Sequence, residues 1–170
     1  MDTVDELIRQ IRLASEAGLF YLALLGALAL PDICGALASK EGTASGSKYR
    51  DWLEKNVPAQ APQADLIYEL RCSLLHQGRA RPAGGHPRIA FTYSGSGAEI
   101  HNLSMVTEGD PASEVGWISI SMFVQEVTNG AEHWMQQFGE TKRVKRNLEK
   151  FARLRPEGLP PFVAGAGVIA

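Results

Sequence analysis

Apolar residues recur at helical spacing through most of the chain, and this pattern predicts a bundle of helices. The segment Asp2 to Ser15 places its apolar side chains on one face, which is typical of an amphipathic helix. The segment Leu19 to Leu30 is apolar nearly all round, so we expect it to form the central and most buried helix. Pro31 is expected to kink that helix or to begin a new one over residues 33–39.

Two further helices are predicted before residue 78. Residues 48–57 place their large apolar side chains on one face, and Ser47 is expected to be the capping residue of this helix. Residues 65–77 then carry an apolar stripe at spacings of three and four. Gly78 stands where a left-handed residue commonly ends a helix, so the second of these helices is expected to stop there.

After Gly78 the apolar pattern changes from helical to alternating. Residues 89–93 alternate apolar with polar or small residues, and after an SGSG turn residues 98–106 can return as a second strand. The pattern therefore predicts one β-hairpin at about residues 88–107, inserted in an otherwise helical domain.

Two helices are predicted after the hairpin. Residues 111–114 can open the first, and its apolar stripe from Ile120 to Phe138 steps by four and three, with a kink expected at Asn129-Gly130. Residues 141–154 are expected to form a last, markedly basic helix.

The whole pattern indicates a mainly α protein with a single helical domain. We expect this domain to span residues 1–155, followed by a tail over residues 156–170. The tail is apolar, but its prolines and glycines oppose a helix at its start. It is therefore expected to lie extended on its own domain or on a partner.

Composition adds limits on partners and compartment. The chain has 170 residues, of which 45% are hydrophobic and 21% charged, so it can bury a core of its own. Its net charge of −2 gives no global attraction to nucleic acid, so any RNA binding would need a local basic patch. Cys34 and Cys72 do not form a C-x-x-C motif, which favours two free thiols in a reducing cytoplasm.

One segment has the length of a membrane span. Gly18 to Ala38 is long and apolar, but Pro31 and Asp32 lie in its middle, and a charge near a bilayer centre costs about 2.5–3.5 kcal/mol. The acidic, amphipathic N-terminus is also unlike a signal peptide. We therefore expect a cytoplasmic protein that uses this segment as a core helix rather than in a membrane.

Candidate chemistry is concentrated in the helix of residues 65–77. Arg71 and His76 are five residues apart, so they leave the helix in directions about 140° apart and are expected to flank one surface without touching. The stretch YELRCSLLHQG resembles the Arg-x4-His motif of the HEPN superfamily of small helical ribonucleases and nucleotide-binding proteins. The upstream stretches FYLALLGALALPDICGAL and KYRDWL are similar to the preceding helices of one bacterial branch, so the resemblance covers about residues 19–78.

The resemblance implies a metal-independent endoribonuclease that acts as a homodimer with a composite cleft, in a defence or toxin setting. RNA cleavage to a 2′,3′-cyclic phosphate needs proton transfers, which suit a histidine, and charge on the phosphate, which suits an arginine. We therefore assign His76 the acid/base role and Arg71 the phosphate-binding role. On this hypothesis each Arg71 approaches the partner's His76, because the two side chains diverge within one helix.

Three further residues are candidates for supporting roles at this site. Cys72 and Glu69 share a face of the helix with His76, and Asp32 is the one charge in the apolar segment upstream. The family often has a polar residue where this chain has Cys72, and this departure favours a non-catalytic binding module for RNA, a nucleotide or a protein. A purely structural pairing of Arg71 with Asp32, and of His76 with Glu69, also stays open.

The remaining polar groups give weaker indications. The last helix could guide RNA phosphates through a group of basic residues, or be a solvated face: Lys142, Arg143, Lys145 and Arg146. No histidine pair has metal-ligand spacing, so we predict no metal and no cofactor. The candidate partners are a second copy of the chain, RNA, and a protein partner such as an antitoxin.

Overall fold

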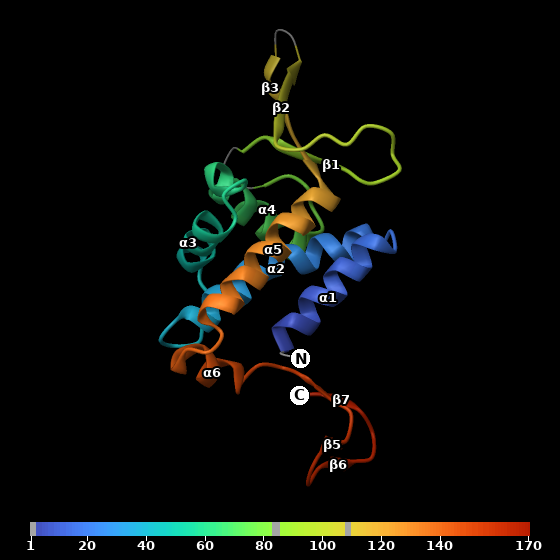
Figure 1. Cartoon of the computed structure of the whole chain (residues 1–170). Coiled ribbons are helices and arrows are strands. Elements are labelled where there is room, and N and C mark those ends of the chain that lie inside the picture. The colour runs from blue at the N-terminus through green and yellow to red at the C-terminus, as the bar shows by residue number, and fades with distance from the viewer. Residues whose placement is uncertain (1–2, 83–85, 108–109) are drawn as a thin grey trace.

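The computed structural model describes residues 3–82, 86–107 and 110–170, so the expected helix start at Asp2 lies outside it. The described part is mainly helical, as predicted (Figure 1). Its helices are α1 Thr3–Glu16, α2 Phe20–Ala38, α3 Gly46–Asn56, the 3-10 turn η1 Ala61–Gln63, α4 Ala64–Gln77, α5 Ile120–Phe138 and α6 Lys142–Leu148. Its strands are β1 Arg88–Thr92, β2 Leu103–Thr107, β3 Asp110–Ser119, β4 Leu154–Arg155, β5 Gly158–Leu159, β6 Val163–Ala164 and β7 Val168–Ile169.

Helix α2 lies at the centre of the bundle and packs against α1, α3, α4, α5 and α6. It is a single helix from Phe20 to Ala38, so no new helix starts at Pro31. A proline inside a helix removes one backbone hydrogen bond. Here Pro31 is itself buried, and tertiary packing on both sides holds the helix through this defect.

The helices that carry the candidate site have well-defined ends. Ser45, and not Ser47, caps α3: its side chain accepts a hydrogen bond from Lys48 N, which leaves Ser47 inside the first turn. At the other end of the site, α4 ends at Gly78 with φ 64°, which confirms the predicted left-handed cap.

The β structure differs from the predicted hairpin. Strands β1, β2 and β3 form one sheet in the order β1-β3-β2, with β1 parallel to β3 and β2 antiparallel to β3. Strand β1 and the strand after SGSG, β2, are therefore not neighbours in this sheet. The segment at residues 111–114, expected to open a helix, lies in β3 instead. A proline fits there because β1 pairs with β3 only from Val115 onward, so Pro111 removes no hydrogen bond from that ladder.

A polar network joins the sheet to the bundle. Gln60 is fully buried in the turn before η1, and its amide nitrogen donates to Glu126 Oε2 of α5 at 2.7 Å and to Asn102 Oδ1 at 3.2 Å. His101 Nε2 lies 3.2 Å from Glu126 Oε1, and His101 Nδ1 accepts a hydrogen bond from Ser119 N. These bonds fix the loop before β2 against the two helical segments.

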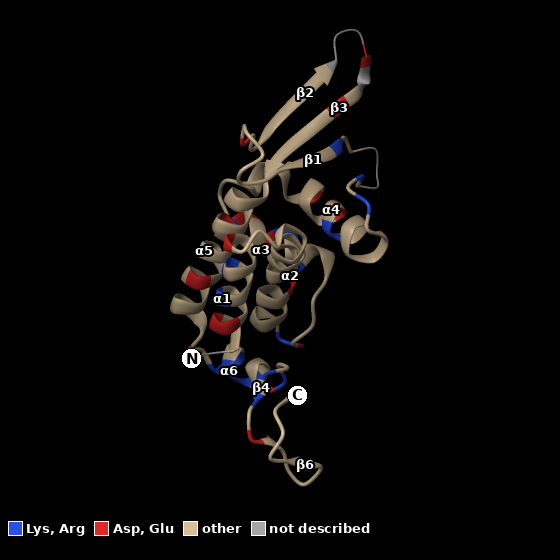
Figure 2. Cartoon of the chain, turned by 90° about the vertical axis from the view of Figure 1, so that its right-hand side faces the viewer, with Lys and Arg blue, Asp and Glu red and all other residues tan. Residues whose placement is uncertain are grey.

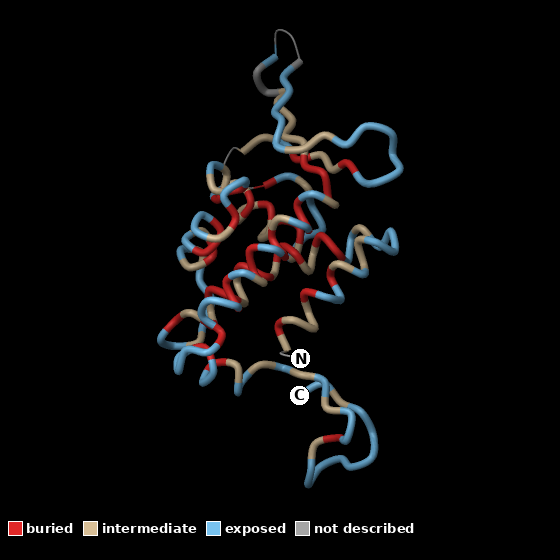
Figure 3. Tube along the Cα trace, in the orientation of Figure 1, coloured by how far each residue is buried: buried red, intermediate tan, exposed pale blue. Residues whose placement is uncertain are grey.

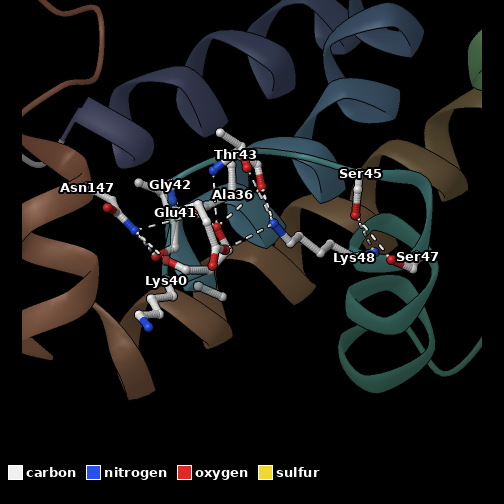
Figure 4. A network of polar contacts seen from close by, with 12 residues as sticks. Ala36, Lys40, Glu41, Gly42, Thr43, Ser45, Ser47, Lys48 and Asn147 are labelled. Carbon is white, nitrogen blue, oxygen red and sulfur yellow. Dashed lines mark hydrogen bonds and ion pairs between the residues drawn. The ribbon is translucent and has the colours of Figure 1, made fainter.

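Helix α6 is shorter than the predicted 141–154 segment, and it closes the C-terminal end of α2. Asn147 is buried and donates to Leu37 O and Ser39 O, both at 2.9 Å, so the last carbonyls of α2 are satisfied (Figure 4). The helix ends at Leu148, and the chain beyond it pairs with the C-terminus through Arg153 and Ala170. Because the backbone of Arg153 bonds to Ala170 in this pairing, it cannot also continue α6 to residue 154.

The C-terminal tail forms two short ladders, β4 with β7 and β5 with β6. It extends away from the bundle and is mostly exposed, as Figure 3 shows. Its apolar side chains include Phe162, which is 82% exposed, and Ile169, which is 73% exposed. Within one chain the tail therefore pairs mainly with itself rather than covering the bundle.

Gly130 of α5 allows α3 and α5 to lie close together. Helix α5 continues through the Asn129-Gly130 position where a kink was expected. A Cβ at Gly130 would lie 2.6 Å from the backbone oxygen of Asn56, so this glycine is needed for helix packing.

We predict that Gly130→Ala lowers stability, although alanine favours a helix over glycine by about 1 kcal/mol. The added methyl group must displace the backbone at Asn56, and overpacking of this kind costs about 1–3 kcal/mol. Thermal and denaturant unfolding measure the change, with His133→Ala as an exposed control on the same helix. A higher melting temperature for Gly130→Ala would contradict the close approach.

Candidate functional site

The candidate site is built on one face of α4, where it meets α2. Arg71 projects toward the middle of α2, and its Nη2 lies 2.6 Å from Asp32 Oδ2. Both side chains are largely covered, with 22% of Arg71 and 14% of Asp32 exposed. This ion pair ties α4 to the central helix and confirms the contact with Asp32 that the sequence left open.

Arg71 also reaches His76, which corrects the expectation that the two would not touch. Arg71 Nη1 lies 3.2 Å from His76 Nε2 within the same chain. The Cβ directions do diverge around the helix, but the arginine side chain is long enough to cross the intervening surface. A second chain is therefore not required to bring an arginine and a histidine together.

The contact defines the tautomer of His76. A guanidinium nitrogen can only donate, so His76 Nε2 must accept, and a neutral imidazole then carries its proton on Nδ1. The ring of His76 is exposed at the end of α4. The site thus presents an accessible imidazole whose Nε2 lone pair is held by a fixed cation.

Asp32 is a carboxylate in an unfavourable environment. Burial raises the pKa of Asp32, and the charge of Arg71 and the nearby His76 offset only part of this effect. Burial also opposes the charge on Arg71, but Asp32 and Cys72 outweigh it and raise the pKa of that guanidinium. Arg71 therefore stays charged, and its position depends on a carboxylate that is costly to keep ionised.

Cys72 lies beside the arginine rather than beside the histidine. Arg71 Nη1 lies 3.9 Å from Cys72 Sγ, and the hydrogen bond of Tyr68 with Cys72 raises the pKa of Tyr68. Among the described residues no hydrogen bond joins Cys72 to His76. The structure therefore gives no support to a cysteine–histidine nucleophile.

Glu69 pairs with a residue that the sequence analysis did not select. Arg50 Nη2 of α3 lies 3.7 Å from Glu69 Oε1, and Arg50 also forms an ion pair with Asp65. The guanidinium carbon of Arg50 lies 4.1 Å from the centre of the Tyr68 ring. Glu69 is thus part of the α3–α4 contact and not a partner of His76. The missed residue stands in the KYRDWL stretch, but nothing in its spacing shows that it points toward α4.

A buried tyrosine lies beneath the site. Tyr49 of α3 is fully buried, its ring centre is 5.4 Å from that of Tyr68, and its hydroxyl has no hydrogen bond with the described residues. Burial raises its pKa, and the charge of Asp32 adds to this effect. The base of the site is therefore neutral, and its fixed charges come from Asp32 and Arg71.

The predicted RNA-guiding residues are mostly engaged in other contacts. Lys and Arg gather around α6 and β4, as Figure 2 shows. Two of them, Arg143 and Arg146, donate to Ala38 O and Lys40 O at the end of α2, while Lys145 pairs with Glu140. Such cations favour a helix C-terminus. These contacts explain their positions without RNA, whereas the Lys142 side chain forms no hydrogen bond or ion pair with the described residues.

Within the described ranges no group of three or more His, Cys, Asp or Glu side chains could hold a metal ion. Helix α2 is long and apolar enough to cross a membrane, and half of its most apolar window is buried in the bundle. Comparison with protein-family models, curated proteins and solved structures found no match to the chain.

We predict that Asp32→Asn gains stability relative to the natural protein as pH rises from 4 to 7. A carboxyl group has an unfolded pKa of about 3.9, and burial raises it in the folded state, so over this range the folded protein binds more protons than the unfolded one. The stability that the raised pKa of Asp32 contributes is present at low pH and is lost as pH rises through that pKa. Asparagine cannot titrate, so the stability of the variant lacks this dependence on pH.

Urea unfolding of both proteins at several pH values measures this difference. The quantity compared is the free energy of unfolding of Asp32→Asn minus that of the natural protein. If this quantity falls as pH rises, the ion pair with Arg71 outweighs burial and holds the pKa of Asp32 below its ordinary value.

We predict that only one of the two free cysteines reacts in the folded protein. Cys34 is fully buried and burial raises its pKa, whereas Cys72 is partly exposed at the site. Iodoacetamide should therefore add a single label, which intact mass and peptide mapping would place on Cys72. Labelling in urea should reach both thiols, and prior labelling of Cys34 in native buffer would contradict the packing of α2.

Proposed function

We propose that the chain is a HEPN-like, metal-independent endoribonuclease in which Arg71 and His76 form the reactive pair. The observation that carries this proposal is the contact of 3.2 Å between the arginine fork and the exposed imidazole, on a helix fixed by Asp32. A positioned cation beside a titratable group is the combination that phosphate transesterification requires.

The proposed reaction assigns a separate role to each side chain. Arg71 binds the non-bridging oxygens of the scissile phosphate, and in doing so it releases His76 Nε2. The freed nitrogen takes the proton of the 2′-hydroxyl as the 2′-oxygen bonds to phosphorus. The bond from phosphorus to the 5′-oxygen then breaks, and a second acid must protonate that oxygen. The products are a 2′,3′-cyclic phosphate and a free 5′-hydroxyl.

A homodimer would supply the second acid as the partner's copy of His76. Support for a dimer comes from α2, whose apolar residues are not all covered within one chain. Incompletely buried positions recur along it at helical spacing and include the one that carries Asp32: Leu22, Leu25, Ala29, Asp32, Ile33 and Ala36. A second copy on this stripe would place two reactive pairs at one interface. A cytoplasmic, defence-related role and a cognate antitoxin are part of the same proposal.

A non-catalytic binding module is the second candidate. The observation in its favour is that both terminal nitrogens of Arg71 already have partners in the chain, namely Asp32 and His76. An arginine held in this way can be structural, and Cys72 adds no polar group of the kind common in the family. On this alternative the same bundle binds RNA, a nucleotide or a protein without cleaving it.

We predict that purified protein cleaves a mixed RNA pool in EDTA and that His76→Ala lowers the rate by about 10²–10⁴-fold. Mass spectrometry of the products should show 2′,3′-cyclic phosphate ends. His133→Ala is the matched control, because it removes an exposed histidine far along the sequence from α4. Full activity of a folded His76→Ala protein would end the assignment of His76, and no cleavage by the natural protein would favour the binding module.

The dimer is tested in the same assay by adding excess His76→Ala to the natural protein. If the partner's histidine is the second acid, mixed dimers are inactive and activity falls with the fraction of natural chains. Differently tagged copies verify that subunits exchange. Unchanged activity despite exchange would place both proton transfers within one chain.

A further inference from the structure

A large open cavity lies on the side of α3 opposite to α4. Its volume is about 850 Å³, within the usual range of ligand pockets of about 300–1,000 Å³. Three parts of the chain line it: the end of α2 with the following loop, the outer face of α3, and the α5–α6 corner. No residue of α4 lines it, so this cavity is separate from the Arg71 and His76 site.

The rim of the cavity carries more positive than negative charge. Four cations line it, Lys40, Lys48, Lys55 and Arg143, against two carboxylates. This local excess contrasts with the net charge of −2 for the whole chain. A cavity with cations around an apolar interior attracts small anions more strongly than the open surface does.

Two of these cations are already held in place. Lys48 donates to Thr43 O at 2.8 Å and lies 3.6 Å from Glu41, while Arg143 donates to Ala38 O. In Figure 4, Lys48 reaches into the network around the α2–α3 loop, and the side chain of Lys40 extends away from it.

The two other cations are free to bind a ligand. Neither Lys40 nor Lys55 has a side-chain hydrogen bond or ion pair with the described part of the chain, and both are exposed. An anion that binds at either lysine would therefore gain a charge contact without breaking an existing one.

The interior of the cavity is aromatic. Trp52 and Trp134 are 4% and 5% exposed and form part of the wall, and Phe138 lies at the edge with 44% exposure. The ring centres of Trp134 and Phe138 are 6.0 Å apart, and the two ring planes meet at an angle of 37°. A partly exposed phenylalanine beside a buried indole gives a flat ligand a ring surface to cover.

We propose that this cavity binds a small planar aromatic anion, with its ring against Phe138 and its charge between Lys40 and Lys55. The ring supplies the apolar contact and the anion supplies the charge contacts, so both parts of the ligand are required. The proposal does not depend on ribonuclease activity, because it rests on residues that the reactive pair does not use.

Binding is tested with the full chain by calorimetry and by tryptophan fluorescence. Trp52 and Trp134 line the cavity, whereas Trp117 lies in the sheet, so a ligand should quench the first two. The probes are AMP and naphthalene-2-sulfonate, which combine a ring with a charge. Adenosine, which lacks the charge, and inorganic phosphate, which lacks the ring, should each bind roughly tenfold more weakly or not at all.

Surface variants then locate the site. Lys55→Glu should weaken AMP binding at least about tenfold, because an attractive charge becomes a repulsive one. Phe138→Ala should weaken it as well, by removing the ring contact. Lys150→Glu is the matched control, since it makes the same charge change at an exposed lysine outside the cavity and should leave the affinity unchanged.

Two results would overturn the proposal. One is the absence of saturable binding for both aromatic anions. The other is equal weakening by Lys55→Glu and Lys150→Glu, which would show attraction by overall charge alone. Neither result bears on RNA cleavage by Arg71 and His76, so failure here leaves the proposed ribonuclease to its own test.

Discussion

The burial of α2 is the constraint on which the rest of the structure depends. This helix is apolar nearly all round, so it must be covered from several directions, and five other helices pack against it. Their packing also overcomes the break that Pro31 would cause in an isolated helix. At the C-terminal end of α2, Asn147 and Arg143 satisfy carbonyl groups that the helix leaves unpaired.

The one carboxylate of α2 shows how this packing is connected to the candidate chemistry. Asp32 is placed in the least favourable part of the chain for a charge, and burial raises its pKa. An apolar residue there would suit the core better, since a buried ion pair seldom adds net stability. What Asp32 does provide is a fixed position for Arg71, and through Arg71 for His76. On the proposed function, the ion pair of Asp32 with Arg71 serves to position the arginine.

The sequence predicts the helices well because they depend on local patterns. The apolar stripes place most helices within a few residues, and Gly78 marks the end of α4. The sheet was predicted wrongly because strand pairing depends on distant residues: β1 pairs in parallel with β3 across more than twenty positions. Pro111 also suggested a helix start, although a position near the beginning of a strand, outside the ladder with β1, accepts a proline equally well.

The candidate site shows the same division between local and distant information. The motif identified Arg71 and His76, but helix geometry alone could not show that a long side chain joins them. Asp32 was a visible anomaly in an apolar segment, and this is why it could be predicted as a supporting residue. Arg50 and the cavity were not predictable, because they depend on how α3 is turned between its neighbours.

Helix α3 contributes residues next to both of the proposed sites. Arg50 and Tyr49 contact Tyr68 of α4. Lys55 and Trp52 of the same helix line the cavity. The backbone of α3 lies close to a neighbouring glycine at both of its ends, at Gly35 with Lys48 and at Gly130 with Asn56. The position of α3 therefore sets both the contacts of Arg50 with α4 and one wall of the cavity.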